Sequence, residues 1–252
     1  MPEPIKQSVL YPTIFKQYPQ IAAGISTRHG GVSKYPFASL NMDNKGPDEE
    51  ALRDENRRIF CNELGFAPDQ LVRSLQVHGT EILVADKSGY YDGFDAIVTD
   101  KKGLLIGVSI ADCTPILVFD SKNDVIAAVH AGWKGTVGQL VAKTLQTMHQ
   151  LYGTMGNNCV AYIGPCIDEC SFEVGEEVAV QFDTPFKTWD NQRGKYMIDL
   201  KKANAAQLLA FEIPQEQIEI SPFSTILNNT DFFSYRHENG VTGRMLAAIG
   251  LI

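Results

Sequence analysis

Three nearly continuous apolar runs lie close together in the middle of this chain, and they limit its fold more than any other feature. The runs are LLIGVSIADC (104–113), PILVFD (115–120) and VIAAVHAG (125–132). A strand with one solvent-exposed face alternates apolar and polar residues, so continuous runs indicate strands that are buried on both faces. The sequence therefore predicts an interior sheet with Cys113 and His130 on neighbouring strands.

Helical segments with recognisable ends surround these runs. Helices are predicted over about 47–65, 135–152 and 200–211, either from end signals or from apolar residues that recur at helical spacing. Gly153 suits the left-handed cap after the second helix, and the Asp199 side chain can cap the start of the third. We expect these helices to flank the predicted sheet.

Further strands complete the predicted fold. Because strands and helices mix without strict alternation, we expect the α/β class in its mixed α+β form. Residues 1–252 are expected to form a single domain of mixed β-sheets flanked by helices. The additional strands are predicted at 20–26, within 71–100, at 159–165, at 217–221 and in a hairpin over 232–252 that turns at Asn239-Gly240.

Composition argues against several classes of protein. The 252 residues carry a formal net charge of -8, which argues against general nucleic-acid binding because protein surfaces that bind nucleic acid are usually basic. No run approaches the roughly 18 apolar residues of a membrane span, so we expect no membrane partner. Five cysteines, an odd count in a chain large enough to fold without disulfides, favour a reducing, cytoplasmic compartment.

Three residues with metal-ligand chemistry lie where predicted strands end: His78 in LQVHGT, Cys113 in SIADCTP and His130 in AAVHAGW. One thiolate and two imidazoles suit zinc or copper, and three protein ligands leave a position open for water or substrate. Asp95 and Asp112 are candidate acid–base groups, and Asp112 is preferred because it adjoins Cys113. Two alternatives remain open, namely ordinary buried side chains and a Cys113 nucleophile with His130 as its base.

Basic residues in three loops are candidates for binding substrate. They are Arg28 in STRHGGVS, Lys134 in AGWKGTVG and Arg236 in FSYRHENGVTGR. Lys134 lies where glycine amides at a helix start can approach phosphate. The alternatives are an ordinary tight turn, a flexible loop and surface ion pairs. The CxxxC pair at 166–170 is a weaker candidate for a second metal site.

Read in order, the motifs STRHGGVS, LQVHGT, SIADCTPIL, AAVHAGWKGT, IGPCIDECSFEV and FFSYRHENGVTGR resemble those of the YfiH-like family. Its members were long labelled laccase-domain proteins or polyphenol oxidases, and later purine nucleoside phosphorylases. The resemblance spans about residue 21 to the C-terminus. It implies a single mixed α/β domain with a zinc site, or a copper site, at His78, Cys113 and His130.

The same resemblance implies an activity and its partners. The expected enzyme uses phosphate to cleave adenosine, inosine, guanosine or methylthioadenosine, and it also deaminates adenosine. The family's arginine positions fall on Arg28 and Arg236, while Ser224 and His237 depart from the family pattern. Three other functions stay open: a cysteine hydrolase or amidase, a copper-dependent polyphenol oxidase, and a purine-binding module without catalysis. A homodimer is possible.

Overall fold

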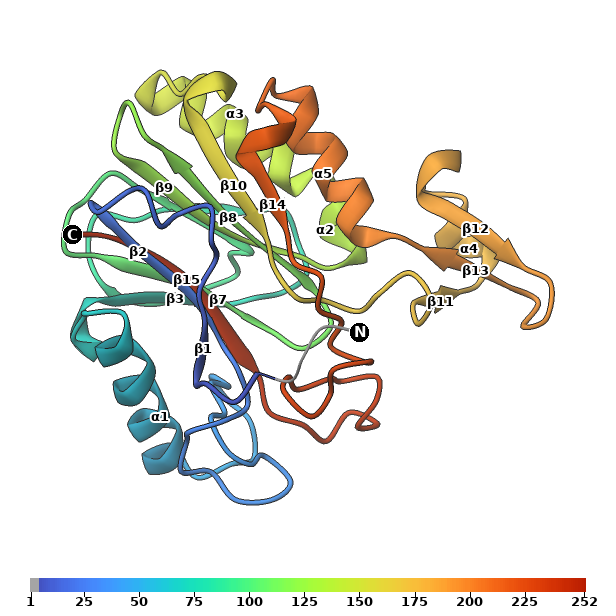
Figure 1. Ribbon diagram of the computed structural model, residues 1–252, viewed down its shortest axis with the longest axis horizontal. Helices are drawn as coiled ribbons and strands as arrows, with labels where there is room; N and C mark the ends of the chain where they lie inside the picture. The colour runs from blue at the N-terminus through green and yellow to red at the C-terminus, as the bar shows by residue number, and fades with distance from the viewer. Residues whose placement is uncertain (1–4) are drawn as a thin grey trace.

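The computed structural model describes residues 5–252 and contains two large sheets, one small sheet and five α-helices (Figure 1). Sheet 1 consists, in spatial order, of β1 (Val9–Leu10), β2 (Ile21–Ser26), β15 (Met245–Leu251), β7 (Leu105–Ile110), β3 (Leu71–Leu75) and β5 (Gly89–Asp92). Sheet 2 consists of β14 (Ile218–Ile220), β10 (Cys159–Ile163), β8 (Thr114–Asp120), β9 (Val125–Ala131), β6 (Ala96–Thr99) and β4 (Ile82–Val84). The small sheet holds β11 (Glu173–Val174), β13 (Lys195–Ile198) and β12 (Lys187–Asp190). The helices are α1 (Glu50–Glu63), α2 (Trp133–Val137), α3 (Leu140–Tyr152), α4 (Glu176–Ala179) and α5 (Leu200–Ala210).

The two large sheets share one core, and helices cover their outer faces (Figure 1). Ile106 and Met245 of sheet 1 belong to the same buried cluster as Leu117 and Phe119 of sheet 2. Helix α1 covers the outer face of sheet 1 through Phe60, and α3 and α5 cover the outer face of sheet 2. The expected mixed α+β fold of a single domain is confirmed.

The apolar runs form strands because each face of sheet 2 meets another apolar layer. On β8, Leu117 and Phe119 face sheet 1, whereas Ile116 and Val118 face the helices. Every residue of β8 and β9 is buried. Burying a side chain of this size contributes about 1.5–3 kcal/mol, so an alternating pattern would have left one of these layers without its stabilising contacts.

The strand order brings the predicted ligands to one end of both sheets. His78 follows β3 and Cys113 follows β7, and these two strands are parallel neighbours. A short turn then carries the chain from sheet 1 into β8 of sheet 2. Strands β8 and β9 are antiparallel with Pro115 opposite His130, so the end of β9 meets the start of β8. The sheet topology therefore places the three residues together.

The single helix expected over 135–152 is wrong, because the structure divides it into α2 and α3. The two helices are separated by Gly138 and Gln139, and Gln139 has a left-handed φ of 61°. Glycine is among the weakest helix formers, which favours a break at this position.

Among residues 5–252, no helix combines the length and apolar character that a membrane crossing needs.

The hairpin expected over 232–252 is wrong in its first arm. Asn239 and Gly240 have φ values of 52° and 85° and form the expected turn, but the residues before them form a loop. Both edges of β15 are already paired, with β2 on one side and β7 on the other. The loop instead reaches the turn between β7 and β8, where the Arg236 backbone N–H donates to the Asp112 carboxylate at 2.7 Å.

Candidate active site

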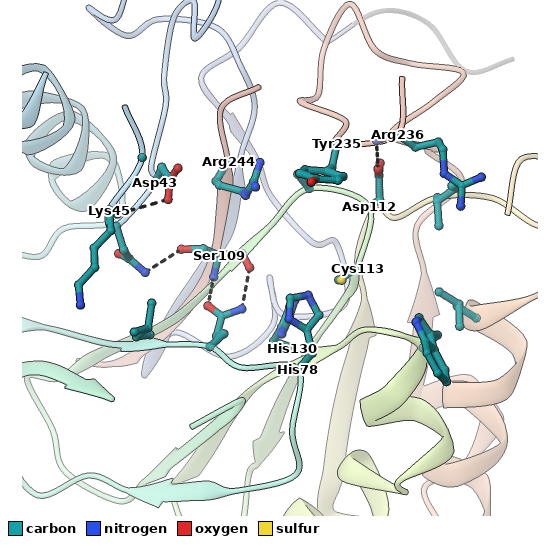
Figure 2. A pocket seen from close by; sticks show the side chains of 18 of the residues that line it. Asp43, Lys45, His78, Ser109, Asp112, Cys113, His130, Tyr235, Arg236 and Arg244 are labelled. Carbon is teal, nitrogen blue, oxygen red and sulfur yellow. Dashed lines mark hydrogen bonds between the residues drawn. The ribbon is translucent and has the colours of Figure 1, made fainter. Parts of the chain in front are cut away.

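The three predicted ligands converge in the structure (Figure 2). The ligand atoms of His78, Cys113 and His130 all lie within 4.8 Å of one another, and the two imidazole rings meet edge to face with centroids 5.0 Å apart. His78 is exposed, Cys113 is half-buried and His130 is buried. This donor set fits zinc or copper, and three protein ligands would leave a coordination position for water or substrate. In the part of the chain that the structure describes, no other group of histidine, cysteine and carboxylate side chains meets the same geometric requirement.

The backbone around the three ligands leaves little space. His78 lies in a turn and has a left-handed φ of 59°. A Cβ atom placed on Gly132 would lie 3.0 Å from the Cys113 sulfur and 3.2 Å from Cδ2 of the His78 ring. A glycine after β9 therefore lets the chain turn towards α2 without displacing two of the ligands.

Asp95, and not Asp112, contacts the proposed ligands. The Asp95 side chain is fully buried, and its carboxylate lies 2.8 Å from Nδ1 of His130. Burial raises the pKa of Asp95, but the hydrogen bonds from His130 and from the Gly79 N–H outweigh it and lower that pKa overall. The preference for Asp112 on the basis of its neighbour Cys113 missed this contact.

Cys113 and His130 favour each other's charged forms. Burial alone would raise the pKa of the Cys113 thiol, but the positive charge of His130 and the nearby His78 outweigh burial and lower this pKa to about 6. Burial lowers the pKa of His130, but Cys113 and Asp95 raise it to about 9. Without a metal, the pair is therefore a thiolate beside an imidazolium at neutral pH, and thiolate is the form that binds metals.

The three ligands open into a cavity of about 640 Å³, within the size range of small-molecule sites. One wall is apolar and continues the small core that lies beside α5. The opposite side is polar, and Figure 2 shows Arg244, Lys45 and Ser109 there, with the three ligands between them and Arg236. The apolar wall is formed by Trp133, Ile167, Phe172 and Leu200.

Two of the predicted site residues lie at the edge of this cavity. Asp112 accepts hydrogen bonds from the Thr225 hydroxyl at 2.6 Å and from the Arg236 N–H at 2.7 Å. The exposed Arg236 guanidinium lies 5.9 Å from the centre of the Phe172 ring. Asp112 thus holds the loop that carries Arg236 against the edge of the cavity.

Arg28 and Lys134 are not among the residues that line the cavity. The Arg28 guanidinium forms an ion pair with Glu238 at 3.1 Å, donates to the Asn229 carbonyl at 2.7 Å and lies over the Phe233 ring. Lys134 is exposed. The long loop after Arg28 gave no indication of the Arg28 contacts, because they depend on residues 229–238, which are distant in sequence.

Several cavity residues were not singled out from the sequence. Asn44 and Lys45 come from a polar loop before α1, while Trp133 and Phe172 lie within the motifs AAVHAGWKGT and IGPCIDECSFEV, of which other residues were chosen as candidates. Arg244 ends the motif FFSYRHENGVTGR, which also holds Arg236. For Asn44 and Lys45 the available signal was the length of the loop before α1, since long loops in compact domains are often functional.

The cysteine pair at 166–170 has a structural environment. Cys166 is fully buried, and burial raises the pKa of its thiol to about 11. It pairs through the backbone with Ser224, whose hydroxyl donates to Asp168. Among residues 5–252 these side chains belong to no metal-binding cluster, so the weaker candidate for a second metal site is not supported.

Comparison with known proteins gives a consistent family. A family model described as "Multi-copper polyphenol oxidoreductase laccase" matches residues 22–252. A "Purine nucleoside phosphorylase" of Bacteroides thetaiotaomicron is 38% identical over 92% of each chain, and one of Deinococcus radiodurans is 40% identical over 90% of this chain and 87% of its own. The crystal structure of the hypothetical protein YfiH from Bacillus licheniformis is 29% identical and superposes with a TM-score of 0.91 over 97% of each chain. The chain therefore belongs to the YfiH-like, laccase-domain family.

Proposed function

We propose that this protein is a metal-dependent purine nucleoside phosphorylase that also deaminates adenosine. Its substrates are adenosine, inosine, guanosine or methylthioadenosine together with phosphate, and phosphorolysis yields the base and ribose-1-phosphate or its methylthio form. One domain over residues 1–252 carries both reactions. The observation that supports this most strongly is the His78–Cys113–His130 group, which opens into a cavity with an apolar aromatic wall and an arginine on the polar side.

The apolar wall suits the purine. Trp133 and Phe172 are half-buried and line the cavity beside the buried Ile167 and Leu200. A flat heteroaromatic base gains from contact with such surfaces, because aromatic stacking adds to the burial of apolar area. Arg236, which lies over Phe172, is placed to contact the bound nucleoside at the edge of this wall.

The polar side suits phosphate. Arg244 is half-buried, and within residues 5–252 its guanidinium donates only to the carbonyl oxygens of Thr242 and Gly243. Across residues 5–252 neither Arg244 nor Arg236 forms an ion pair with a carboxylate. An arginine with free donors favours a phosphate or another oxyanion, so we assign phosphate contact to Arg244 in place of Arg28 and Lys134.

The chemistry then requires few groups. In phosphorolysis a phosphate oxygen forms a bond to the anomeric carbon, the bond from that carbon to the purine nitrogen breaks, and its electron pair leaves with the purine, which takes a proton from solvent. In deamination water adds at C6 of adenosine and ammonia leaves. A zinc ion, or copper in its place, would supply Lewis-acid polarisation beside His78, Cys113 and His130. Asp112 lines the cavity, keeps the Arg236 loop at its edge and is the proposed proton carrier for deamination.

A second candidate function is supported by one observation. The lowered pKa of Cys113 beside the raised pKa of His130 is typical of a cysteine nucleophile with its base, so a metal-free hydrolase or amidase remains an alternative. Polyphenol oxidation, which the family description names, is less well supported, because residues 5–252 hold one metal-binding group and no second cluster. All five cysteines are free thiols, in keeping with the proposed cytoplasmic location.

The test is incubation of purified, zinc-loaded protein with adenosine, with and without phosphate, followed by separation of the products. We expect adenine, ribose-1-phosphate and, from the inosine formed by deamination, hypoxanthine only when phosphate is present, and inosine to accumulate when phosphate is absent. The Cys113→Ser variant should retain the fold and lose both products together with the metal. Full turnover by metal-free protein in the presence of a chelator would overturn the proposal and favour the cysteine hydrolase.

A further inference from the structure

We propose that Asp95 is a positioning residue that fixes His78 and His130 in their relative arrangement before any metal binds. The inference rests on the proposed metal site but goes beyond the choice of ligands. It explains how an exposed loop residue and a buried strand residue can form one preorganised site. Four hydrogen bonds to a single buried carboxylate carry the argument.

The carboxylate of Asp95 joins two segments of different sheets. Its Oδ1 lies 2.8 Å from Nδ1 of His130 and accepts the His78 backbone N–H at 3.0 Å. Its Oδ2 accepts the N–H groups of Val77 at 3.2 Å and Gly79 at 2.7 Å. The side chain has no exposed surface, so water does not compete for these bonds.

The bond to His130 determines which ring nitrogen is available. With Nδ1 engaged by Asp95, Nε2 is the nitrogen left to bind a metal. A carboxylate in this position also fixes the orientation of the ring and increases its basicity as a ligand. His130 is further held because its backbone N–H donates to the Asp95 carbonyl at 2.8 Å.

The three bonds to the loop stabilise a conformation that is otherwise costly. His78 has a left-handed φ of 59°, which is unfavourable for a residue with a side chain. Three successive N–H groups, those of Val77, His78 and Gly79, converge on the carboxylate and form an anion-binding concavity. Asp95 therefore offsets the cost of the turn that presents the His78 ring.

Asp95 itself has a fixed position. Its backbone N–H donates to the Glu81 carbonyl at 3.0 Å, and the next residue, Ala96, begins β6 opposite Val129 of β9. The carboxylate is thus anchored in sheet 2, while the loop that it holds continues from β3 of sheet 1. This geometry makes Asp95 a hydrogen-bonded link between the His78 loop and sheet 2 at the site.

The test compares Asp95→Asn with a matched variant, Asp120→Asn. Asp120 is also fully buried, and it accepts the N–H groups of Lys122 and Asn123 in a turn at the far end of β8. An asparagine keeps the volume, but one side-chain oxygen becomes an NH₂ group that cannot accept the loop N–H groups. Zinc affinity is measured by competition with a chromogenic chelator.

We expect Asp95→Asn to weaken zinc binding about 10- to 100-fold, the usual effect of losing a carboxylate behind a histidine ligand. Asp120→Asn should lower thermal stability and leave zinc affinity unchanged. Equal zinc affinity in Asp95→Asn and the unmodified protein would overturn the proposal. Equal weakening in both variants would also overturn it, because the effect would then follow general destabilisation.

A measurement on the unmodified, metal-free protein remains decisive if Asp95→Asn does not fold. The amides of Val77, His78 and Gly79 should exchange with deuterium at least about 10-fold more slowly than exposed loop amides, because all three donate to a buried group. Exchange as fast as in other loops would overturn preorganisation. Slow exchange together with zinc binding but no phosphorolysis would instead leave this inference standing and reject the proposed function.

Discussion

The proton affinities of Cys113 and His130 depend on each other because the two side chains meet in the interior. In metal-free protein the Cys113 pKa is lowered to about 6 and that of His130 is raised to about 9. We predict one thiolate absorbance step with a midpoint near pH 6 in an ultraviolet pH titration. Cys113→Ser should remove this step, and His130→Ala should move it to higher pH, since the largest favourable charge is lost.

The other thiols provide an internal control for this titration. Burial raises the pKa of Cys61 and Cys166 to about 11, raises that of Cys159 to about 12, and raises that of Cys170. A low-pH step that persists in Cys113→Ser would therefore contradict the assignment of that step to Cys113.

The ionisation of Cys113 also makes the stability of the metal-free fold depend on pH. The folded pKa of Cys113 lies below the value near 8.5 of an unfolded thiol. Its ionisation therefore stabilises the fold most fully above the unfolded value, and this contribution is lost as the pH falls through about 6.

Arg244 and Arg28 differ in the contacts that their guanidinium groups make, and this separates substrate binding from stability. Arg244→Ala should raise the KM for phosphate about 10- to 100-fold, the value of a charge-assisted hydrogen bond, with little change in adenosine deamination. Arg28→Ala should instead lower the free energy of unfolding by about 1–3 kcal/mol, because it leaves Glu238 and the Asn229 carbonyl without their donor. Steady-state kinetics and denaturant unfolding of both variants check this, and the opposite pattern would restore Arg28 as the phosphate contact.

At the scale of elements, the strands were predictable where burial alone decides their conformation. The apolar runs identified β7, β8 and β9 because both faces of each strand contact other apolar layers. The predicted hairpin was wrong because β2 and β7 already pair with both edges of β15, which leaves no free edge for the segment before Asn239. Local turn residues such as Asn239 and Gly240 cannot report that competition.

The turn between β9 and α2 gives a prediction at the same scale. In Gly132→Ala the new methyl group would lie 3.0 Å from the Cys113 sulfur and 3.2 Å from the His78 ring, so both ligands must shift by a few tenths of an ångström. We expect weaker zinc binding and reduced turnover while the fold is retained. Metal analysis and activity assays measure both effects.

Gly153→Ala is the matched control for that substitution. Gly153 has a left-handed φ of 70° and ends α3, and a Cβ there would meet no atom within 4 Å. Its replacement should lower the free energy of unfolding by about 1 kcal/mol through backbone strain and leave zinc binding unchanged. Wild-type zinc affinity in Gly132→Ala would show that the turn tolerates a side chain.

At the scale of the whole molecule, the site exists because two sheets packed face to face bring the ends of β3, β7 and β9 together at one edge. The ligand chemistry of His78, Cys113 and His130 was visible in the sequence, together with the motifs of the family. Asp95 could not be identified as their partner, because its contact depends on the register that sets β6 against β9. Long-range pairing of this kind leaves no local pattern in a single sequence.

Since the ligands come from both sheets, metal binding should stabilise the whole fold. His78 follows a strand of sheet 1, Cys113 lies where the chain crosses between the sheets, and His130 belongs to sheet 2. Zinc at 100 times its dissociation constant adds about 2.7 kcal/mol if it binds only the folded state. For a domain of this size that corresponds to a Tm increase of about 5–10 °C. Calorimetry with zinc and with chelator measures the difference, which Cys113→Ser should abolish, and an equal zinc-induced shift in that variant would place the stabilising metal elsewhere.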